Sequence, residues 1–494
     1  MGSNPVAVPT TRIKFPSFDL SSALEADHKA RMAAEDAGES LDDGEIEFEN
    51  EEAEEEAHGE SVPPIHLSDN PPSMSRKNKK YAKLTKRSRA KRAAEAVERA
   101  ANRGVKPFVV ELAKGALPVE LEDFDASSLP VSSSGWNANP RKKLSHGLQR
   151  VWKNLEALTS ASGLKLLRWD GQSCITLVDS HDRIIAVLGG VPHGSKGMEW
   201  QAVEAAATAA ALRCRESSAF TEAQKHGRRG DFASRTVGFG YGNGRRKPQN
   251  YRVSGKANRK AMQELLQNQA IRRISGFQNA LFNTFCHKNY VEHMDTNNEL
   301  LRKQPELRAN FPGTAFAATT FNLGPLSFSP PHMDPDNRAS SWCADTSMGP
   351  FNPDKGGHLV LWDIGLVIRF PPGSTILFPS ALITHSTIPI QTHETRYAMV
   401  QYSSGGLFRW RENGFQSDKT FLARATPEER VMRELARASR WKFSLQKFTR
   451  WTDICHGDWR GTARTEAGLD ELSDLSDLEE PLHVLHPNKR VCRQ

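Results

Sequence analysis

The stretch GGHLVLWDIGLVIRFPPGSTILFPSALITHSTIPI, residues 356–390, decides the fold of this chain. It contains short runs of Val, Ile, Leu and Phe, such as 365–370 and 375–378, on either side of the turn-forming sequence Pro-Pro-Gly-Ser. Short apolar runs bounded by Pro and Gly are typical of β-strands joined by tight turns. Because residues 313–410 share this character, we expect them to form an all-β region.

The segment before this region is expected to be mixed. Residues 164–169, 174–178 and 184–188 are short apolar or alternating runs separated by turn sequences, which predicts a small meander of strands. The Ala-rich run 202–213 has the composition of a helix. This combination of strands and helices predicts an α+β part ahead of the all-β region.

Two further segments predict helices, and one predicts a loop. Apolar residues recur near helical spacing within 256–307, and residues 428–448 also have a helical composition. The glycine-rich sequence GFGYGNG, residues 238–244, contains no GK[ST] and lacks a strand-loop-helix context, so it is not a phosphate-binding loop. We expect it to be a tight turn or a loop on the substrate side.

Both ends of the chain differ from its middle in composition. Residues 42–56 are strongly acidic and poor in apolar residues, so burial cannot offset the entropy of ordering them. Residues 76–103 contain twelve Lys or Arg and only two acids, which favours a basic segment that becomes ordered on a polyanion; a solvated solubility tail is the alternative. We therefore expect a disordered acidic and Pro-rich tail (1–75), a basic segment (76–106), an α+β part (107–310), a β-rich core (311–415), and a C-terminal helical segment with a loose tail (416–494).

Overall composition narrows the class of protein. The chain has 494 residues, a formal net charge of +7, and six scattered Cys with no CxxC pair. This pattern argues against a structural zinc module or a disulfide framework. No apolar run approaches the roughly 20 residues that span a bilayer, and the N-terminus has no signal pattern. We expect a soluble intracellular protein with no membrane partner.

The sequence SPPHMDPDN, residues 329–337, carries the first candidate metal ligands. His332 and Asp334 lie two positions apart, so on an extended segment both side chains point to the same side. The flanking prolines stiffen the backbone and reduce its conformational entropy. An isolated His-x-Asp pair is a weak signal, because it also occurs by chance.

A second histidine strengthens this signal. His385 lies 51 residues after Asp334, between the strand expected at 375–378 and a further strand expected at 387–390. Two His and one carboxylate form a facial triad that leaves coordination positions on Fe(II) open for a co-substrate and O₂. The alternative is that His385 is a histidine satisfied within the core.

Arg396 is the candidate anchor for that co-substrate. It lies 11 residues after His385, and alternation along a strand at 395–402 places it on the same face as Ala398, Val400 and Tyr402. A charged Arg on such a face is costly unless it is paired. A ligand carboxylate would satisfy it through a bidentate contact, whereas a protein carboxylate is the alternative partner.

These spacings resemble those of the 2-oxoglutarate oxygenase superfamily. The sequences at 356–386 and 394–410 are similar to the TET/JBP family, above all to its transposon-associated branch in mushroom-forming fungi. The close resemblance covers about residues 310–415, and a looser one reaches back to about residue 145. It implies a double-stranded β-helix (jelly roll) that uses Fe(II), 2-oxoglutarate and O₂ to oxidise the methyl group of 5-methylcytosine, or of thymine in the JBP branch.

The resemblance also implies roles for individual residues. Asn337, three positions after the metal-binding Asp, is expected to contact the flipped base, and Tyr402 is expected to border it. His358 is expected to help hold 2-oxoglutarate. Two positions depart from the family pattern: Ala398 replaces a Ser that contacts the co-substrate, and Ser404 replaces a His that touches the base. The Cys-rich zinc region of animal members is absent, so we expect no structural zinc.

The expected function is therefore a dioxygenase that binds methylated DNA in the nucleus. A methyl group in duplex DNA cannot reach a buried iron, so the base has to be flipped out of the helix. Two alternatives remain open: an oxygenase of the same fold with a protein or small-molecule substrate, and a transposon-associated DNA-binding protein with an inactive core.

Overall fold

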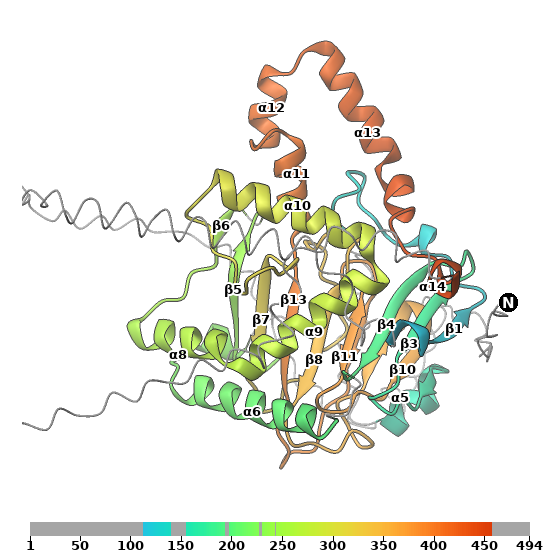
Figure 1. The fold of residues 1–494 in the computed structure, drawn as a ribbon, viewed down its shortest axis with the longest axis vertical. Coiled ribbons are helices and arrows are strands. Elements are labelled where there is room, and N and C mark those ends of the chain that lie inside the picture. Colours follow the sequence, from blue (N-terminus) through green and yellow to red (C-terminus); the bar gives the residue numbers. More distant parts are fainter. Residues whose placement is uncertain (1–111, 140–154, 193–196, 227–229, 243, 457–494) are drawn as a thin grey trace, which may run out of the picture.

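The computed structural model describes residues 112–139, 155–192, 197–226, 230–242 and 244–456. The tails expected at 1–75 and 76–106 lie outside these residues, as does the end of the chain from residue 457. The described part is an α+β fold in which two β-sheets face each other and helices cover their outer faces (Figure 1). Within the described residues, no helix is long and apolar enough to cross a membrane.

The larger sheet has nine strands and is mostly antiparallel. Its only parallel pair joins the strands β1 and β3 at one edge. The strands, in order across the sheet, are β1 (Leu117–Leu121), β3 (Ile175–Asp179), β4 (Ile184–Gly190), β11 (Thr375–Phe378), β8 (Cys343–Met348), β13 (Tyr397–Tyr402), β7 (Ala318–Asn322), β5 (Ser234–Gly240) and β6 (Gln249–Asn250).

The smaller sheet has four strands, in the order β12, β9, β10, β2. Its central hairpin comes from residues 356–390, where β9 and β10 pair antiparallel. The Gly365 backbone between them has a φ of 74°, a left-handed conformation that Gly adopts without strain. The strands are β12 (His385–Thr387), β9 (Leu359–Leu361), β10 (Leu366–Ile368) and β2 (Lys165–Leu167).

Helices cover the outer face of the larger sheet. Their buried side chains, among them Phe277, Leu281 and Phe285 of α9, form one core with residues from the strands. The side chain of Asn268 caps α9 by accepting from the backbone of Ala270 and Ile271. The helices on this side are α6 (Gly197–Glu216), α8 (Lys256–Gln267), α9 (Gln269–Phe285) and α10 (His287–Lys303), with the short α7 (Glu222–Lys225) between the first two in the chain.

A second core fills the space between the two sheets. It joins Ile376 and Phe378 of the larger sheet to Leu359, Leu361 and other residues of the smaller one. Because successive side chains of a strand point to opposite faces, Val360 instead belongs to a third cluster, beneath helix α5 (Leu155–Ser162). The two facing sheets are consistent with the jelly-roll arrangement that was expected.

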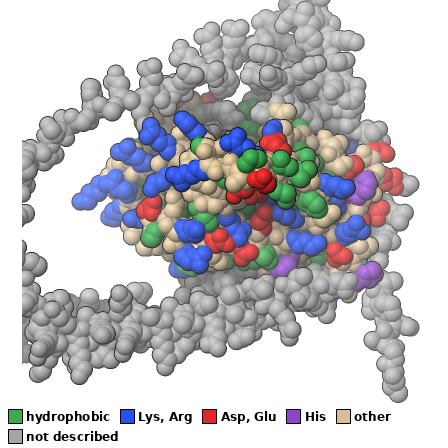
Figure 2. Space-filling model, turned by 90° about the horizontal axis from the view of Figure 1, so that it is seen from above, with side chains coloured by type: hydrophobic (Ala, Val, Ile, Leu, Met, Phe, Trp, Pro, Cys, Tyr) green, Lys and Arg blue, Asp and Glu red, His purple; other side chains and the backbone are tan. Residues whose placement is uncertain are grey.

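The C-terminal helices project from one end of the body (Figure 1). The last of the long helices, α13, begins with a capping box between Thr426 and Glu429 and with Pro427 in its first turn. Seen from this end in Figure 2, apolar side chains gather beside acidic ones, with Lys and Arg spread over the rest. The projecting helices are α11 (Gly405–Glu412), α12 (Asp418–Arg424) and α13 (Pro427–Leu445). The last helix, α14 (Trp451–His456), instead lies against the body, where Trp451 and Ile454 join the core.

Three local predictions need correction. The expected meander does not form, because β2 pairs parallel with β10 in the smaller sheet while β3 and β4 pair in the larger one. The glycine-rich sequence 238–244, expected to be a turn or loop, begins inside strand β5, which ends at Gly240. Glycine is required at Gly238 and Gly240, because a side chain at either position would meet neighbouring atoms. The strand expected at 387–390 instead begins at His385 and ends at Thr387, because His385 pairs with Leu361 of β9.

Candidate metal and co-substrate site

The two candidate histidine ligands face each other across a backbone pair. His332 N–H donates to the His385 carbonyl and His385 N–H donates to the His332 carbonyl, each at 2.9 Å. Residues that exchange both hydrogen bonds in this way lie directly opposite each other, with their side chains on the same side. The centroids of the two imidazole rings are accordingly only 4.2 Å apart.

Asp334 completes the group. Its backbone N–H donates to the carbonyl of Ser380 at 3.0 Å, which fixes the segment beside β12. His385 Nε2 lies 4.0 Å from Asp334 Oδ2, and one ligand atom from each of His332, Asp334 and His385 falls within 4.8 Å of the others. An ion with bonds of about 2 Å would draw these atoms to roughly 3 Å from one another. The structure thus brings together the three residues proposed from the sequence.

The backbone also fixes which ring nitrogen can bind a metal. His332 Nδ1 lies 2.8 Å from the Pro330 carbonyl, and His385 Nδ1 lies 2.9 Å from the Ile383 carbonyl. A carbonyl only accepts hydrogen bonds, so each Nδ1 carries the proton and each Nε2 carries the lone pair. This is the outer-shell support that metal-binding histidines normally have. The donor set of two imidazoles and one carboxylate fits Fe(II).

A second group of potential ligands is less suited to a metal. Asp125, Asp179 and His181 also bring one ligand atom each within 4.8 Å of one another. Both carboxylates, however, bind the guanidinium of Arg183, and Asp179 also accepts from the backbone of Ala126. Because these carboxylates are already paired, we assign this group to local structure.

Arg396 lies on the inner face of the larger sheet. Its side chain is 3 % exposed, and Nη1 donates to the Ser327 carbonyl at 3.0 Å. Its Nε is buried without a hydrogen-bond partner, and no ion pair joins Arg396 to a carboxylate anywhere in the described part of the chain. A buried guanidinium with an unused donor is costly unless a ligand satisfies it. Within the described residues, Arg396 therefore keeps a buried donor, Nε, that a ligand could satisfy.

Asp345 shares this face and was not identified from the sequence. It lies opposite Ile376 on one side and opposite Val400 on the other, so it points into the space between the sheets. Burial raises the pKa of Asp345 to about 6, although the charge of Arg396 opposes the shift. Its Oδ1 has no hydrogen-bond partner. The space between the sheets thus contains a carboxylate that is easily protonated.

Ser347 is a second residue that the sequence did not reveal. It lies directly opposite Ala398 across the β8–β13 pair, so both side chains point to the inner face. Ser347 is fully buried and its Oγ has no hydrogen-bond partner. The Ser347 hydroxyl therefore lies opposite Ala398, the position at which the family pattern has a serine hydroxyl. Only the strand register, which the sequence does not show, could have indicated it.

The two proposed substrate residues lie in the same region. Asn337 Nδ2 donates to Ser380 Oγ at 3.2 Å, and Ser380 also holds the backbone of Asp334. The hydroxyl of Tyr402 lies 3.0 Å from Thr320 Oγ1, and Tyr402 belongs to the core cluster between the sheets. Both side chains are 9 % exposed. Their contacts hold them in defined orientations near the metal-bearing segment.

His358 is not brought together with the triad. It precedes β9, on which Leu359 and Leu361 share the face of His385. The charged groups that influence His358 are Arg369, Asp354 and Arg168, and burial lowers its pKa to about 4. The lowered pKa keeps the imidazole neutral at pH 7. Its Nδ1 is buried without a hydrogen-bond partner, so this nitrogen still needs an acceptor or donor. A role for His358 in co-substrate binding stays a prediction.

Ser404 has a structural contact in this fold. Its Oγ accepts a hydrogen bond from the backbone of Tyr241 at 3.1 Å, and its backbone forms a bridge with Asn337. Ser404 therefore ties the segment before α11 to both the β5 end and the metal-bearing segment. Ser404 thus lies beside Asn337.

Comparison with known proteins gives distant similarities only. No family model matches the chain, and no curated protein matches it. Among solved structures, NgTET1 in complex with 5mC DNA is 14 % identical with a TM-score of 0.34, covering 49 % of this chain and 82 % of that one. A viral collagen prolyl hydroxylase from Paramecium bursaria Chlorella virus-1, in its 2OG complex, is 15 % identical with a TM-score of 0.14, covering 17 % of this chain and 55 % of that one.

A third solved structure is an oxidoreductase of the 2OG-Fe(II) oxygenase family from Burkholderia pseudomallei. It is 18 % identical with a TM-score of 0.20, and the similarity covers 34 % of this chain and 66 % of that one. The chain thus spans less than two thirds of this protein and of the viral hydroxylase. Similarities this low carry no functional argument, so the proposed function rests on the residues of the site.

Proposed function

We propose that this protein is an Fe(II)- and 2-oxoglutarate-dependent dioxygenase, an oxidoreductase that oxidises the methyl group of a flipped DNA base and converts 5-methylcytosine to 5-hydroxymethylcytosine. The observation that carries the proposal is the backbone pair between His332 and His385, which aims both imidazoles and Asp334 at one point. Arg396, on the inner face of the neighbouring sheet, supplies an unsatisfied cation for a free dicarboxylate. The likeness in sequence to the fungal branch of the TET/JBP family agrees with this assignment.

Each residue then has a defined task. His332, Asp334 and His385 hold the metal, and bound Fe(II) together with 2-oxoglutarate and O₂ supplies the oxidising chemistry. Arg396 binds the far carboxylate of 2-oxoglutarate, and Ser347 offers a hydroxyl on the same face. The apolar side chains of Ile376 and its neighbours exclude water from this space.

The substrate assignment rests on Asn337 and Tyr402. Asn337 offers an amide that can hydrogen-bond a base edge, and Tyr402 offers an aromatic ring beside it. A flipped base costs a few kcal/mol of stacking and pairing, which such contacts would partly offset. We further propose a nuclear location and methylated DNA as the partner, with the basic segment 76–106 adding salt-dependent affinity.

The decisive experiment incubates the full chain with Fe(II), 2-oxoglutarate and methylated duplex DNA. Mass spectrometry of the DNA and measurement of succinate should both detect product. Asp334→Ala should give neither, whereas Asp336→Ala, an exposed aspartate two positions later, should retain both. Succinate without DNA oxidation would favour a protein or small-molecule substrate. Tight DNA binding without succinate would favour an inactive DNA-binding protein.

A further inference from the structure

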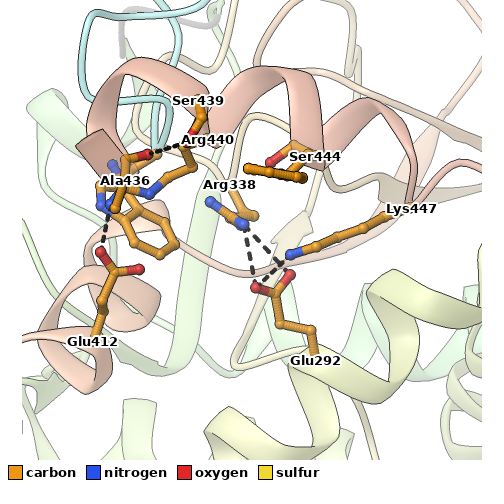
Figure 3. Close-up of a pocket in the computed structure, with 10 residues that line it drawn as sticks. Glu292, Arg338, Glu412, Ala436, Ser439, Arg440, Ser444 and Lys447 are labelled. Carbon is orange, nitrogen blue, oxygen red and sulfur yellow. Dashed lines mark hydrogen bonds and ion pairs between the residues drawn. The ribbon is translucent and has the colours of Figure 1, made fainter. Parts of the chain in front are cut away.

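A cavity lies behind the metal-bearing segment, between that segment and α13. Its volume is about 240 Å³, and charged side chains surround it. Figure 3 shows the Arg338 guanidinium in its centre, with Arg440 to one side and Lys447 to the other. The residues that line it are Trp136, Glu292, Arg338, Glu412, Ala436 and Arg440, together with four from the end of α13 and just beyond it.

Arg338 is the most deeply buried charged residue of this group. Its side chain is 1 % exposed, and Nη2 reaches Glu292 only through long contacts of 3.3 and 3.4 Å. Its Nε and Nη1 atoms are buried and have no hydrogen-bond partner. Leaving buried donors unsatisfied is destabilising, and more so when the group is charged. The geometry therefore calls for an additional acceptor.

Aromatic rings do not provide that acceptor. The Arg338 guanidinium lies 4.3 Å from the Trp136 ring and 5.1 Å from the Phe408 ring, and Arg440 lies 4.3 Å from the same Trp136. In a stacked cation–π contact the ring meets the face of the guanidinium, whereas the N–H groups point outward in its plane. Stacking thus fixes the orientation of Arg338 while its in-plane donors stay available.

The charges around the cavity leave one positive charge uncompensated. Arg338, Arg440 and Lys447 supply three cations, and Glu292 and Glu412 supply two carboxylates. Glu292 is shared, because Lys447 Nζ also lies 2.8 Å from its Oε1. Although burial alone would raise the pKa of Glu292, Arg338 and Lys447 lower it to about 2, so it stays ionised. A monoanion would balance the charges.

We infer that this cavity is a binding site for an oxyanion of the phosphate type, with Arg338 as its central donor and Arg440 and Lys447 beside it. The three cations approach from different elements, so a tetrahedral ion can offer each an oxygen, which a planar carboxylate cannot. The same chemistry has two sources: a free phosphate or phosphate monoester, and a backbone phosphate of a nucleic acid.

The position of Arg338 gives such a site a structural consequence. Arg338 directly follows Asn337, and its backbone N–H donates to the Ser403 carbonyl at 2.9 Å. An oxyanion on Arg338 therefore connects α13 to the segment that carries the metal ligands. The inference does not depend on the proposed oxidase function, because none of its residues belongs to the triad.

The test uses inorganic phosphate as the probe. Phosphate is titrated calorimetrically into the full chain against chloride at equal ionic strength. Ala436 is exposed and lines the cavity, so Ala436→Trp blocks the cavity without removing a charge or a buried side chain. Ala438→Trp is the matched control, since Ala438 is exposed on the same helix but lies outside the lining. We expect Ala436→Trp to lower phosphate affinity about tenfold or more and Ala438→Trp to leave it unchanged.

A second arm distinguishes the two sources with a short DNA duplex. If Ala436→Trp weakens DNA binding and phosphate competes with the DNA, the occupant is a backbone phosphate. If both variants bind DNA alike while only Ala438→Trp retains phosphate binding, the occupant is a free phosphate or monoester. Equal phosphate affinity in the two variants, or equal heats for phosphate and chloride with the unmodified protein, would overturn the inference.

Discussion

The two regions on either side of residues 332–338 each bury a carboxylate, and the pKa values of the two carboxylates shift in opposite directions. Asp345, between the sheets, has its pKa raised to about 6 by burial, and Arg396 only partly opposes the rise. Glu292, beneath α13, has its pKa lowered to about 2, because Arg338 and Lys447 outweigh the effect of burial. Burial alone therefore does not set the charge of a cavity; the number and distance of opposite charges decide it.

This difference suits the two regions to different ligands. Between the sheets Arg396 Nε, Asp345 Oδ1 and Ser347 Oγ lack hydrogen-bond partners, so a ligand there can bind through both donors and acceptors. Beneath α13 the carboxylates are already paired with cations, and the unused atoms belong to Arg338. The region between the sheets suits a metal with a dicarboxylate, and the cavity beneath α13 suits a single anion.

The largest effect is expected from removing the anionic metal ligand. Asp334→Ala should abolish iron binding and turnover, because two neutral imidazoles cannot replace the charge of the carboxylate. Calorimetric iron binding and succinate production measure the two losses, and a chelator should reproduce them in the unmodified protein. Asp336→Ala is the control. Normal turnover in Asp334→Ala would remove this aspartate from the metal site.

Arg396→Ala should raise the 2-oxoglutarate concentration required for half-maximal activity about 100-fold, because a charge-assisted bidentate contact contributes roughly 3 kcal/mol. Iron binding should stay largely intact, since Arg396 lies outside the triad. Arg396→Lys keeps the charge but loses the forked guanidinium. Its 2-oxoglutarate requirement should lie between those of the unmodified protein and Arg396→Ala. An unchanged requirement in Arg396→Ala would show that the dicarboxylate binds elsewhere.

Glu292→Gln tests the cavity beneath α13. It leaves Arg338 buried without its carboxylate, which should destabilise the fold by about 3–5 kcal/mol in urea unfolding at pH 7. The pKa of Glu292 is lowered by folding, so its contribution is present above about pH 4.5 and is lost as the pH falls towards 2. The difference in free energy of unfolding between the unmodified protein and Glu292→Gln should therefore become smaller below pH 4.5.

Glu412→Gln is the matched control for this prediction. Glu412 also pairs with an arginine, Arg440, but its side chain is 44 % exposed, so the loss should be about 1 kcal/mol or less. Equal destabilisation by both substitutions would mean that Arg338 is satisfied by something other than Glu292.

Asp345→Asn should change the stability of the fold in the opposite direction to Glu292→Gln. Its pKa is raised by folding, so the stability linked to its protonated form is present below about pH 3.8 and is lost as the pH rises through 6. At pH 7–8 the variant should therefore be more stable than the unmodified protein, by up to about 3 kcal/mol, and this gain should vanish near pH 4. Urea unfolding at both pH values measures it. A variant less stable at pH 8 would show that ionised Asp345 is paired in the fold.

Much of the fold was predictable because its signals are local. The turn around Gly373, the helices within 256–307 and the strand that ends at Tyr402 all follow from periodicity and turn chemistry. The partner of β2 was not predictable, since its three residues carry no information about which sheet they join. Strand pairing over such distances depends on the whole core.

The candidate site was predictable in the same uneven way. His332, Asp334 and His385 could be found because a spacing of two residues and a well-placed later His leave a trace in the sequence. Arg338 and Asp345 could not be found, since their significance depends on burial without a sufficient partner, a property of the packed structure alone. An Arg or Asp in a short polar stretch reads as an ordinary surface residue.

Ser347 offers the smallest and most specific test of the proposed co-substrate site. Its hydroxyl faces the same space as Arg396 and lies opposite Ala398, so a co-substrate carboxylate held by the guanidinium can accept a hydrogen bond from it. Removing it in Ser347→Ala should raise the 2-oxoglutarate requirement several-fold, in line with about 1 kcal/mol for one hydrogen bond, and leave iron binding unchanged. The double variant Ser347→Ala with Ala398→Ser moves the hydroxyl to the facing strand and should restore most of the affinity, because the two positions share one face. A loss that Ala398→Ser does not recover, or no loss at all, would mean that the hydroxyl of Ser347 does not reach the ligand.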